Sequence, residues 1–144
     1  MNIFPSDPEI ISAFRSKGFR ATSQRIAIYR NVLMSREHPT AQRIYENVKK
    51  THPTVSLATV YKTLSVLREL NLIQDLSLNQ GETRFEPNLE PHINLFCERC
   101  GDLRDTSEGC LKEIIERVVK QAKFIPARQS FVIYGFCEKC SKLN

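Results

Sequence analysis

The sequence lacks the features that would place it in a membrane or outside the cell. Its 144 residues contain no run that approaches the roughly 18 to 20 uninterrupted apolar residues of a membrane helix. The first ten residues, MNIFPSDPEI, carry no basic region followed by an apolar core, which a secretion signal requires. We therefore expect a cytoplasmic protein without a membrane partner.

Internal repeats, low-complexity segments and the composition of disordered chains are also absent. Hydrophobic residues make up 41% and charged residues 26%, which is ordinary globular usage. The length suits one domain or two small ones, because domains typically run about 100 to 150 residues. A large multidomain enzyme is excluded.

Charge of one sign is only in modest excess. The formal net charge of +5 permits a nucleic acid partner without requiring one. Residues 1–87 hold twelve basic and eight acidic side chains, a net +4, whereas residues 88–144 hold nine and eight, a net +1. The first part of the chain is therefore the part expected to face a polyanion.

Helical periodicity dominates the first seventy residues, in segments separated by cap and turn signals. We expect helices over 8–17, with Asp7 as the N-cap, over 23–34, and from 41 to about 52 after the cap Thr40. A fourth begins after the cap Ser56, and its apolar stripe consists of Leu57, Val60, Leu64 and Leu67. Its opposite face is expected to present side chains that can approach base edges or phosphates, namely Thr59, Tyr61, Lys62, Thr63 and Ser65.

The pattern changes after residue 71. Segments 72–78 and 82–85 flank Asn79, Gln80 and Gly81 and predict a hairpin. Helices followed by a two-stranded ribbon predict a winged helix-turn-helix domain over 1–87, and residues 88–91 are expected to form a hinge.

The remaining residues, 92–144, combine predicted strands at 93–95, 103–105 and 131–136 with an amphipathic helix over 111–119. The fold class is thus α+β. So short a segment with few large apolar groups is expected to need zinc and a partner subunit.

The five cysteines are better explained by metal than by disulfides, because the cytosol keeps thiols reduced. Cys97 and Cys100 form one CxxC pair and Cys137 and Cys140 a second, which fits a tetrahedral structural zinc site. Four unrelated buried thiols, or a redox pair, are the alternatives. A redox pair is less favoured because neither CxxC sits between a strand and a helix start in a βαβ context. Cys110 is expected to be a packed, unreactive thiol.

Five ordered motifs resemble the ferric uptake regulator family, and they span most of the chain. They are FRATSQR at 19–25, HPTA at 38–41, SLATVYKTL at 56–64, CERCG at 97–101 and YGFCEKC at 134–140. The resemblance implies an N-terminal winged-helix domain and a C-terminal α/β dimerisation domain with a four-cysteine zinc site. It also implies a homodimer whose binding to AT-rich palindromic operator DNA is controlled by metal.

The resemblance further implies a regulatory metal site with ligands from both domains. The matching positions are His38, Glu86, His92 and Asp105, and Asn94 stands where the family has a second histidine. A neutral amide oxygen is a weaker ligand than imidazole, but this mixed nitrogen and oxygen set still suits Fe²⁺ or Mn²⁺. Alternatively, the two histidines are a cap neighbour and a solvated loop residue.

The peroxide-responsive branch of the family resembles this chain most, through its four cysteines and its two histidines. That branch usually has aspartate at the position of Glu86 and histidine at that of Asn94. Because the cysteines and histidines match that branch, the sequence predicts a metal-dependent repressor that responds to peroxide through bound iron or manganese. The alternative is a regulator of iron, manganese or zinc level without peroxide sensing.

Contacts to DNA are expected from the first domain. Tyr61 and Thr59 are candidates for base edges and thymine methyl groups, and Arg15 for an adjacent minor groove. The phosphate contacts are expected from Arg20, Arg25, Ser56 and Lys62. A solvated helix face is the simpler alternative.

The alternative to a DNA-binding regulator is an enzyme that uses zinc or a thiol for catalysis. A catalytic zinc keeps an open coordination position, whereas four thiolates close the shell. We therefore expect no zinc- or thiol-dependent catalysis.

Overall fold

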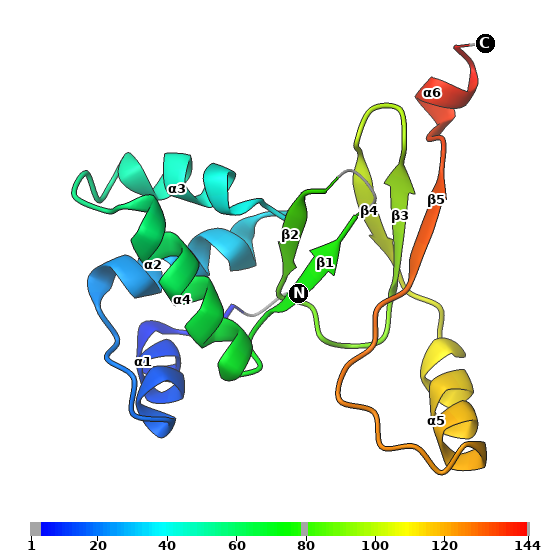
Figure 1. Cartoon of the computed structure of the whole chain (residues 1–144), viewed down its shortest axis with the longest axis horizontal. Helices are drawn as coiled ribbons and strands as arrows, with labels where there is room; N and C mark the ends of the chain where they lie inside the picture. The colour runs from blue at the N-terminus through cyan, green and yellow to red at the C-terminus, as the bar shows by residue number, and fades with distance from the viewer. Residues whose placement is uncertain (1–3, 79–80, 144) are drawn as a thin grey trace. The chain divides into compact units, whose positions relative to one another are not determined.

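The structure is a computed structural model that describes residues 4–78 and 81–143, and the chain divides into two compact units after Leu89 (Figure 1). The first unit contains α1 (Asp7–Ser16), α2 (Ser23–Met34), α3 (Ala41–Lys49), α4 (Leu57–Glu69), β1 (Gln74–Ser77) and β2 (Thr83–Glu86). The second contains β3 (Ile93–Cys97), β4 (Leu103–Thr106), α5 (Leu111–Gln121), β5 (Val132–Gly135) and α6 (Glu138–Ser141). In the described part of the chain, no helix has the length and apolar character needed to cross a membrane.

Hydroxyl side chains cap the helices of the first unit. Thr40 Oγ1 accepts from the N–H of Arg43 at 3.2 Å, and Ser56 Oγ accepts from the N–H of Thr59 at 3.1 Å. The prediction that Asp7 caps α1 is wrong, because Ser6 occupies that position. The N–H and the hydroxyl of Ser6 both donate to the Glu9 carboxylate at 2.7 Å, as in a capping box.

One apolar core joins the four helices and the hairpin of the first unit. The predicted stripe of α4 supplies Val60, Leu64 and Leu67, which are at most 1% exposed. Thr63 was expected on the opposite face, and that expectation is wrong, because its side chain is fully buried. Its hydroxyl donates to the carbonyl of Thr59 at 2.8 Å, so a threonine is accommodated on the buried face.

The hairpin is attached to the beginning of α3. Strands β1 and β2 pair antiparallel, and Asn79 and Gln80 of the predicted turn lie outside the described residues. The N–H of Phe85 donates to the carbonyl of Pro39 at 3.1 Å, and Thr40 forms a bridge with Arg84. Because of these contacts, the residues on either side of Pro39 lie close to the residues on either side of Phe85.

The second unit is built on a three-stranded sheet with the order β4-β3-β5. Strand β3 pairs antiparallel with β4 and parallel with β5, and α5 and α6 lie at opposite ends of the sheet (Figure 1). Phe96 and Leu103 are buried on one face. Leu95 and Ile133 are neighbours on the other face and are 40% and 55% exposed.

Together these elements form the predicted α+β fold, with four helices and a hairpin followed by a small sheet with two helices.

Candidate metal centres and nucleic-acid face

Four thiols meet in the second unit. The sulfur atoms of Cys97, Cys100, Cys137 and Cys140 all lie within 4.8 Å of one another, and those of Cys100 and Cys137 are 3.8 Å apart. In a tetrahedral zinc site with Zn–S bonds of about 2.3 Å, neighbouring sulfurs are about 3.8 Å apart. The donor set and its spacing therefore fit structural zinc.

Each cysteine pair occupies the end of a strand. The first pair spans the turn from β3 to β4, where Gly101 adopts a φ of +73° and its N–H donates to the carbonyl of Cys97 at 2.9 Å. The second pair lies where β5 leads into α6, with Cys137 at the N-cap. The N–H of Cys137 donates to Sγ of Cys97 at 3.3 Å, which joins the two pairs.

The surroundings of the cysteines give their thiols different pKa values. The backbone N–H groups of Cys100 and Cys137 lower the pKa of Cys97 to about 6. Burial raises the pKa of Cys140 to about 12, and hydrogen bonding with the neighbouring thiols adds to that effect. The N–H of Asp102 lowers the pKa of Cys100, but bonding with Cys97 and burial outweigh it, so the net shift is upward. The raised pKa values of Cys100 and Cys140 mean that their thiolate forms are unfavourable in the cluster. A cation bound among the four sulfur atoms would stabilise all four as thiolates.

Cys110 does not belong to this cluster. It was expected to pack on the apolar side of its helix, and that expectation is wrong, because Cys110 is exposed at the N-cap of α5. Burial on α5 begins one residue later, with Leu111.

In the first unit, His38 and Glu86 face each other. Nε2 of His38 lies 2.6 Å from Oε2 of Glu86, and the two side chains are 4% and 1% exposed. Oε1 of Glu86 accepts from the N–H of Asn88 at 2.9 Å. His38 has a φ of +48°, a conformation unusual for a residue other than glycine, so the chain holds this imidazole in place at some cost in backbone strain.

In the second unit, His92, Asn94 and Asp105 are neighbours. The carbonyl of Glu90 lies 2.7 Å from Nδ1 of His92, so Nδ1 carries the donated proton and Nε2 remains a lone-pair donor. Nδ2 of Asn94 lies 3.3 Å from that Nε2. Among the described residues, nothing hydrogen-bonds to Oδ1 of Asn94, which is buried. Asp105 lies opposite Asn94 in the sheet register and is exposed.

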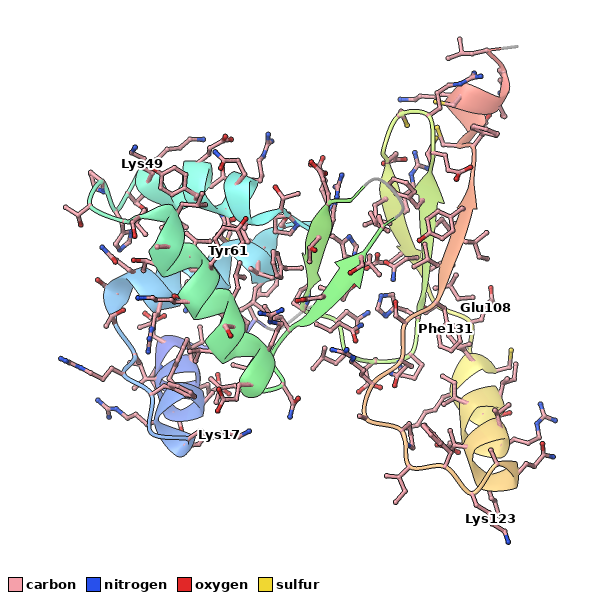
Figure 2. The ribbon with its side chains drawn as sticks, in the orientation of Figure 1. Lys17, Lys49, Tyr61, Glu108, Lys123 and Phe131 are labelled. Carbon is pink, nitrogen blue, oxygen red and sulfur yellow. The ribbon has the colours of Figure 1, made fainter. Side chains whose placement is uncertain are left out.

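The expected DNA-contacting residues cluster in part. Arg20, Arg25, Thr59 and Lys62 line one surface hollow at the beginning of α2, and the guanidinium of Arg25 donates to the carbonyl of Arg20 at 2.9 Å. Tyr61 is 56% exposed on α4 (Figure 2).

The other expected residues have different surroundings. The hydroxyl of Thr59 lies 2.9 Å from that of Ser56, so both also serve the helix cap. Arg15 lies in the last turn of α1 and does not line the hollow.

Thr22 and Gln24 also line the hollow, although they were not among the residues predicted to contact DNA. Thr22 caps α2, accepting from the N–H of Arg25 at 3.3 Å, and Nε2 of Gln24 donates to Thr54 at 3.1 Å. Their place in the TSQR segment, at the start of a predicted helix, could have indicated that they lie at this surface. Lys17, labelled in Figure 2, donates to the carbonyl of Glu69 at 2.7 Å and so supports the end of α4.

Known proteins resemble this chain over most of its length. The family model described as "Ferric uptake regulator family" matches residues 16–134. The peroxide-responsive repressor PerR of Staphylococcus aureus strain Mu50 is 33% identical over 132 residues, which cover 92% of this chain and 89% of that protein.

Solved structures share the fold. The Campylobacter jejuni peroxide stress regulator superimposes with a TM-score of 0.74 at 29% identity, covering 94% of this chain and all of that one. The Helicobacter pylori ferric uptake regulator Fur superimposes with a TM-score of 0.76 at 19% identity, covering 93% and 90%. The chain belongs to the ferric uptake regulator family and is a transcriptional regulator rather than an enzyme.

Proposed function

We propose that this protein is a homodimeric, metal-dependent repressor of the cytoplasm. Residues 1–87 bind operator DNA, 88–91 form a hinge, and 92–144 form the dimerisation domain. The observation that carries the proposal is the pair of buried ligand sets, His38 with Glu86 and His92 with Asn94. Membership in the family and the name of the 33% identical relative support a repressor.

Zinc is proposed to have a structural role at the four cysteines. Sulfur spacing, backbone N–H donors and the raised pKa values of Cys100 and Cys140 support it, because a divalent cation offsets the charge of four thiolates. Four sulfur ligands leave no open coordination position, so the ion stabilises the fold of the second unit.

A second ion, Fe²⁺ or Mn²⁺, is proposed to take ligands from His38, Glu86, His92, Asn94 and Asp105. Two imidazoles, two carboxylates and one amide form a nitrogen and oxygen set, which suits these ions better than thiolates do. The proton on Nδ1 of His92 leaves Nε2 as its ligand atom. Because the ligands belong to two units, binding of the ion would be coupled to the hinge at 88–91.

Peroxide is the proposed signal. The relative named above is a peroxide-responsive repressor, and bound iron would direct oxidation to His38 or His92. Glu86 and Asn94 are the positions that depart from the peroxide-responsive pattern. The second candidate is therefore a repressor that reports the level of the metal and is indifferent to peroxide.

The proposed DNA partner is an AT-rich palindromic operator. Exposure of Tyr61 supports base contacts from α4, with Thr59 beside it and Arg15 for the minor groove. The hollow between Arg20, Arg25 and Lys62 suits a phosphate, because the first turn of α2 carries no acidic side chain and its N-terminus favours an anion. Ser56 is the fourth phosphate candidate.

A second copy of the chain is proposed to cover the apolar side chains of the second unit. Leu95 and Ile133 are exposed on the sheet, and Ile114 and Val118 of α5 are 40% and 55% exposed. Apolar surface of this kind marks an interface. A palindromic operator matches the two-fold symmetry of such a dimer.

The test uses zinc-containing protein from which the regulatory metal has been removed by a chelator. Light scattering gives the oligomeric state, and the operator is selected from a random duplex library with the Mn²⁺-loaded protein. Anaerobic titration with Fe²⁺ and with Mn²⁺ is followed by fluorescence anisotropy of that duplex, and peroxide is then added to each complex.

Three outcomes distinguish the candidates. Loss of DNA binding from the iron form alone, with an added oxygen on His38 or His92 by mass spectrometry, supports the peroxide sensor. Binding that persists in both forms supports the metal-level regulator. Binding that is the same with and without either ion contradicts the regulatory site altogether.

A further inference from the structure

Arg99 lies between Cys97 and Cys100 and contacts the other cysteine pair. Its Nη1 donates to the carbonyl of Cys140 at 2.8 Å and lies 3.5 Å from the carbonyl of Leu143. Its guanidinium carbon lies 5.5 Å from the centre of the Phe136 ring, within cation–π range. Arg99, which lies between the two cysteines of the first pair, therefore contacts Phe136 just before the second pair and the carbonyl of Cys140 at the end of that pair.

The second cysteine pair needs such support. Strand β5 ends at Gly135, and α6, which carries Cys140, has only four residues. An isolated helical turn is marginally stable, since few hydrogen bonds compensate for the order it imposes. The carbonyl of Cys140, near the end of α6, accepts from the N–H of Leu143 at 3.3 Å, and Arg99 adds a second, charged donor to it at 2.8 Å.

Charge acts in the same direction. Four thiolates and one Zn²⁺ carry a net charge of −2, which a neighbouring guanidinium stabilises. Arg104 is a second cation near the cluster: its pKa is raised mainly by Asp102 and in smaller part by Cys137 and Cys100. Its Nε bonds to the Asp102 carboxylate at 2.6 Å, and no hydrogen bond joins it to the second pair among the described residues. Both arginines place a positive charge near the cysteines, but only Arg99 contacts the second pair. Substituting each in turn therefore separates the effect of charge from the effect of that contact.

We propose that Arg99 is a positioning residue that holds the Cys137–Cys140 segment against the first cysteine pair and thereby slows the loss of zinc. The inference rests on the proposal that the four cysteines bind zinc. It adds a residue that binds no metal itself but determines how long the metal stays.

The test measures the rate of zinc transfer from the full-length protein to a chromophoric chelator, in wild type and in Arg99→Ala, Arg99→Lys and Arg104→Ala. Loss of an outer-shell partner typically costs 10- to 100-fold in metal affinity. We expect Arg99→Ala to release zinc at least about tenfold faster, and Arg104→Ala to stay within about threefold of wild type. Arg99→Lys, which keeps the charge but loses the planar group, should lie between them.

Several results would overturn the proposal. Equal release rates in wild type and Arg99→Ala contradict it, and equal acceleration in Arg99→Ala and Arg104→Ala assigns the effect to charge alone. If Arg99→Ala is isolated without zinc, its affinity is measured by zinc titration instead, and an affinity equal to that of wild type contradicts the role. Wild-type protein that holds no zinc would overturn the zinc site itself, a failure that the starting metal content reveals before any variant is compared.

Discussion

Nε2 of His38 lies 2.6 Å from Oε2 of Glu86, although 48 positions separate the two residues in the chain. The proximity follows from the attachment of β2 to the beginning of α3, through the Phe85–Pro39 hydrogen bond and the Thr40–Arg84 bridge. An imidazole and a carboxylate are thus held together in a buried place, where a divalent cation interacts strongly with the carboxylate charge.

Glu86→Gln should weaken binding of the regulatory ion. The amide keeps the size of the side chain and an oxygen near His38 but removes the negative charge. We expect the Mn²⁺ dissociation constant of the zinc-loaded protein to rise at least about tenfold, or ~1.4 kcal/mol. Calorimetric titration checks this. The matched control is Glu82→Gln, because Glu82 has a side chain that is 62% exposed. Equal losses in both variants would contradict a specific role for Glu86.

Asn94→His should have the opposite effect. Oδ1 of Asn94 is buried without a hydrogen-bond partner among the described residues, and Nδ2 of the same side chain lies 3.3 Å from Nε2 of His92. Imidazole is a stronger ligand than an amide oxygen for these ions, so the Mn²⁺ affinity should increase by about tenfold. Asn47→His on α3 serves as the control for an added surface histidine. An unchanged affinity in Asn94→His would mean that residue 94 is not a ligand.

The sequence predicted the parts of the fold that depend on local spacing. The apolar stripe of α4 and the two CxxC pairs could be recognised because helical period and turn geometry fix which side chains meet. Thr63 shows where residue type misled the prediction. Its position is three residues after Val60 and four before Leu67, so the helical period alone places it on the buried stripe.

Other features depended on contacts that no spacing reveals. Proximity of His38 to Glu86 requires the hairpin to attach to α3, and the proton position on His92 depends on the carbonyl of Glu90. Arg99 offered no signal, because an arginine inside a CxxC turn reads as an ordinary exposed cation. The exposed Cys110 was misjudged because much of the apolar face of α5 is uncovered within one chain.

Cys97→Ser should remove zinc and unfold the second unit. Structural zinc contributes folding free energy on the order of 10 kcal/mol, more than a small domain can lose. Zinc content and thermal unfolding by circular dichroism measure the effect. Cys110→Ser is the matched control, since that thiol is exposed outside the cluster, and it should retain zinc and stability. Full zinc content and an unchanged melting temperature in Cys97→Ser would rule out the four-cysteine site.

Zinc binding should release protons, and zinc affinity should fall as the pH is lowered. Because the second unit is expected to unfold without zinc, its thiols have the ordinary cysteine pKa of about 8.5 in zinc-free protein. They are therefore mostly protonated at pH 7.5 and almost fully protonated at pH 5.5, and zinc should displace about four protons at either pH.

Calorimetric titrations of zinc-free protein in two buffers of different ionisation enthalpy give that number directly. Cys110→Ser should behave as wild type. Release of about two protons per zinc or fewer would contradict binding by four thiolates.

Tyr61 and Lys62 are adjacent on α4 but should contribute to DNA binding in different ways. Lys62→Ala removes a phosphate contact, so binding to the operator and to random duplex should weaken by similar factors, and the slope of log K against log salt should fall by about 1. Tyr61→Ala removes a proposed base contact and should cost about 1–3 kcal/mol on the operator, with little change on random duplex.

Fluorescence anisotropy at several salt concentrations separates the two effects, because only a phosphate contact releases a condensed counterion. Lys49→Ala is the control, since the ammonium of Lys49 on α3 bonds to the Tyr45 hydroxyl at 2.9 Å and lies outside the proposed DNA face. If Lys49→Ala and Lys62→Ala lost the same affinity with the same change in salt slope, net charge rather than the face of α4 would govern the lysine contribution to binding. If Tyr61→Ala weakened random and operator duplex equally, Tyr61 would not read sequence.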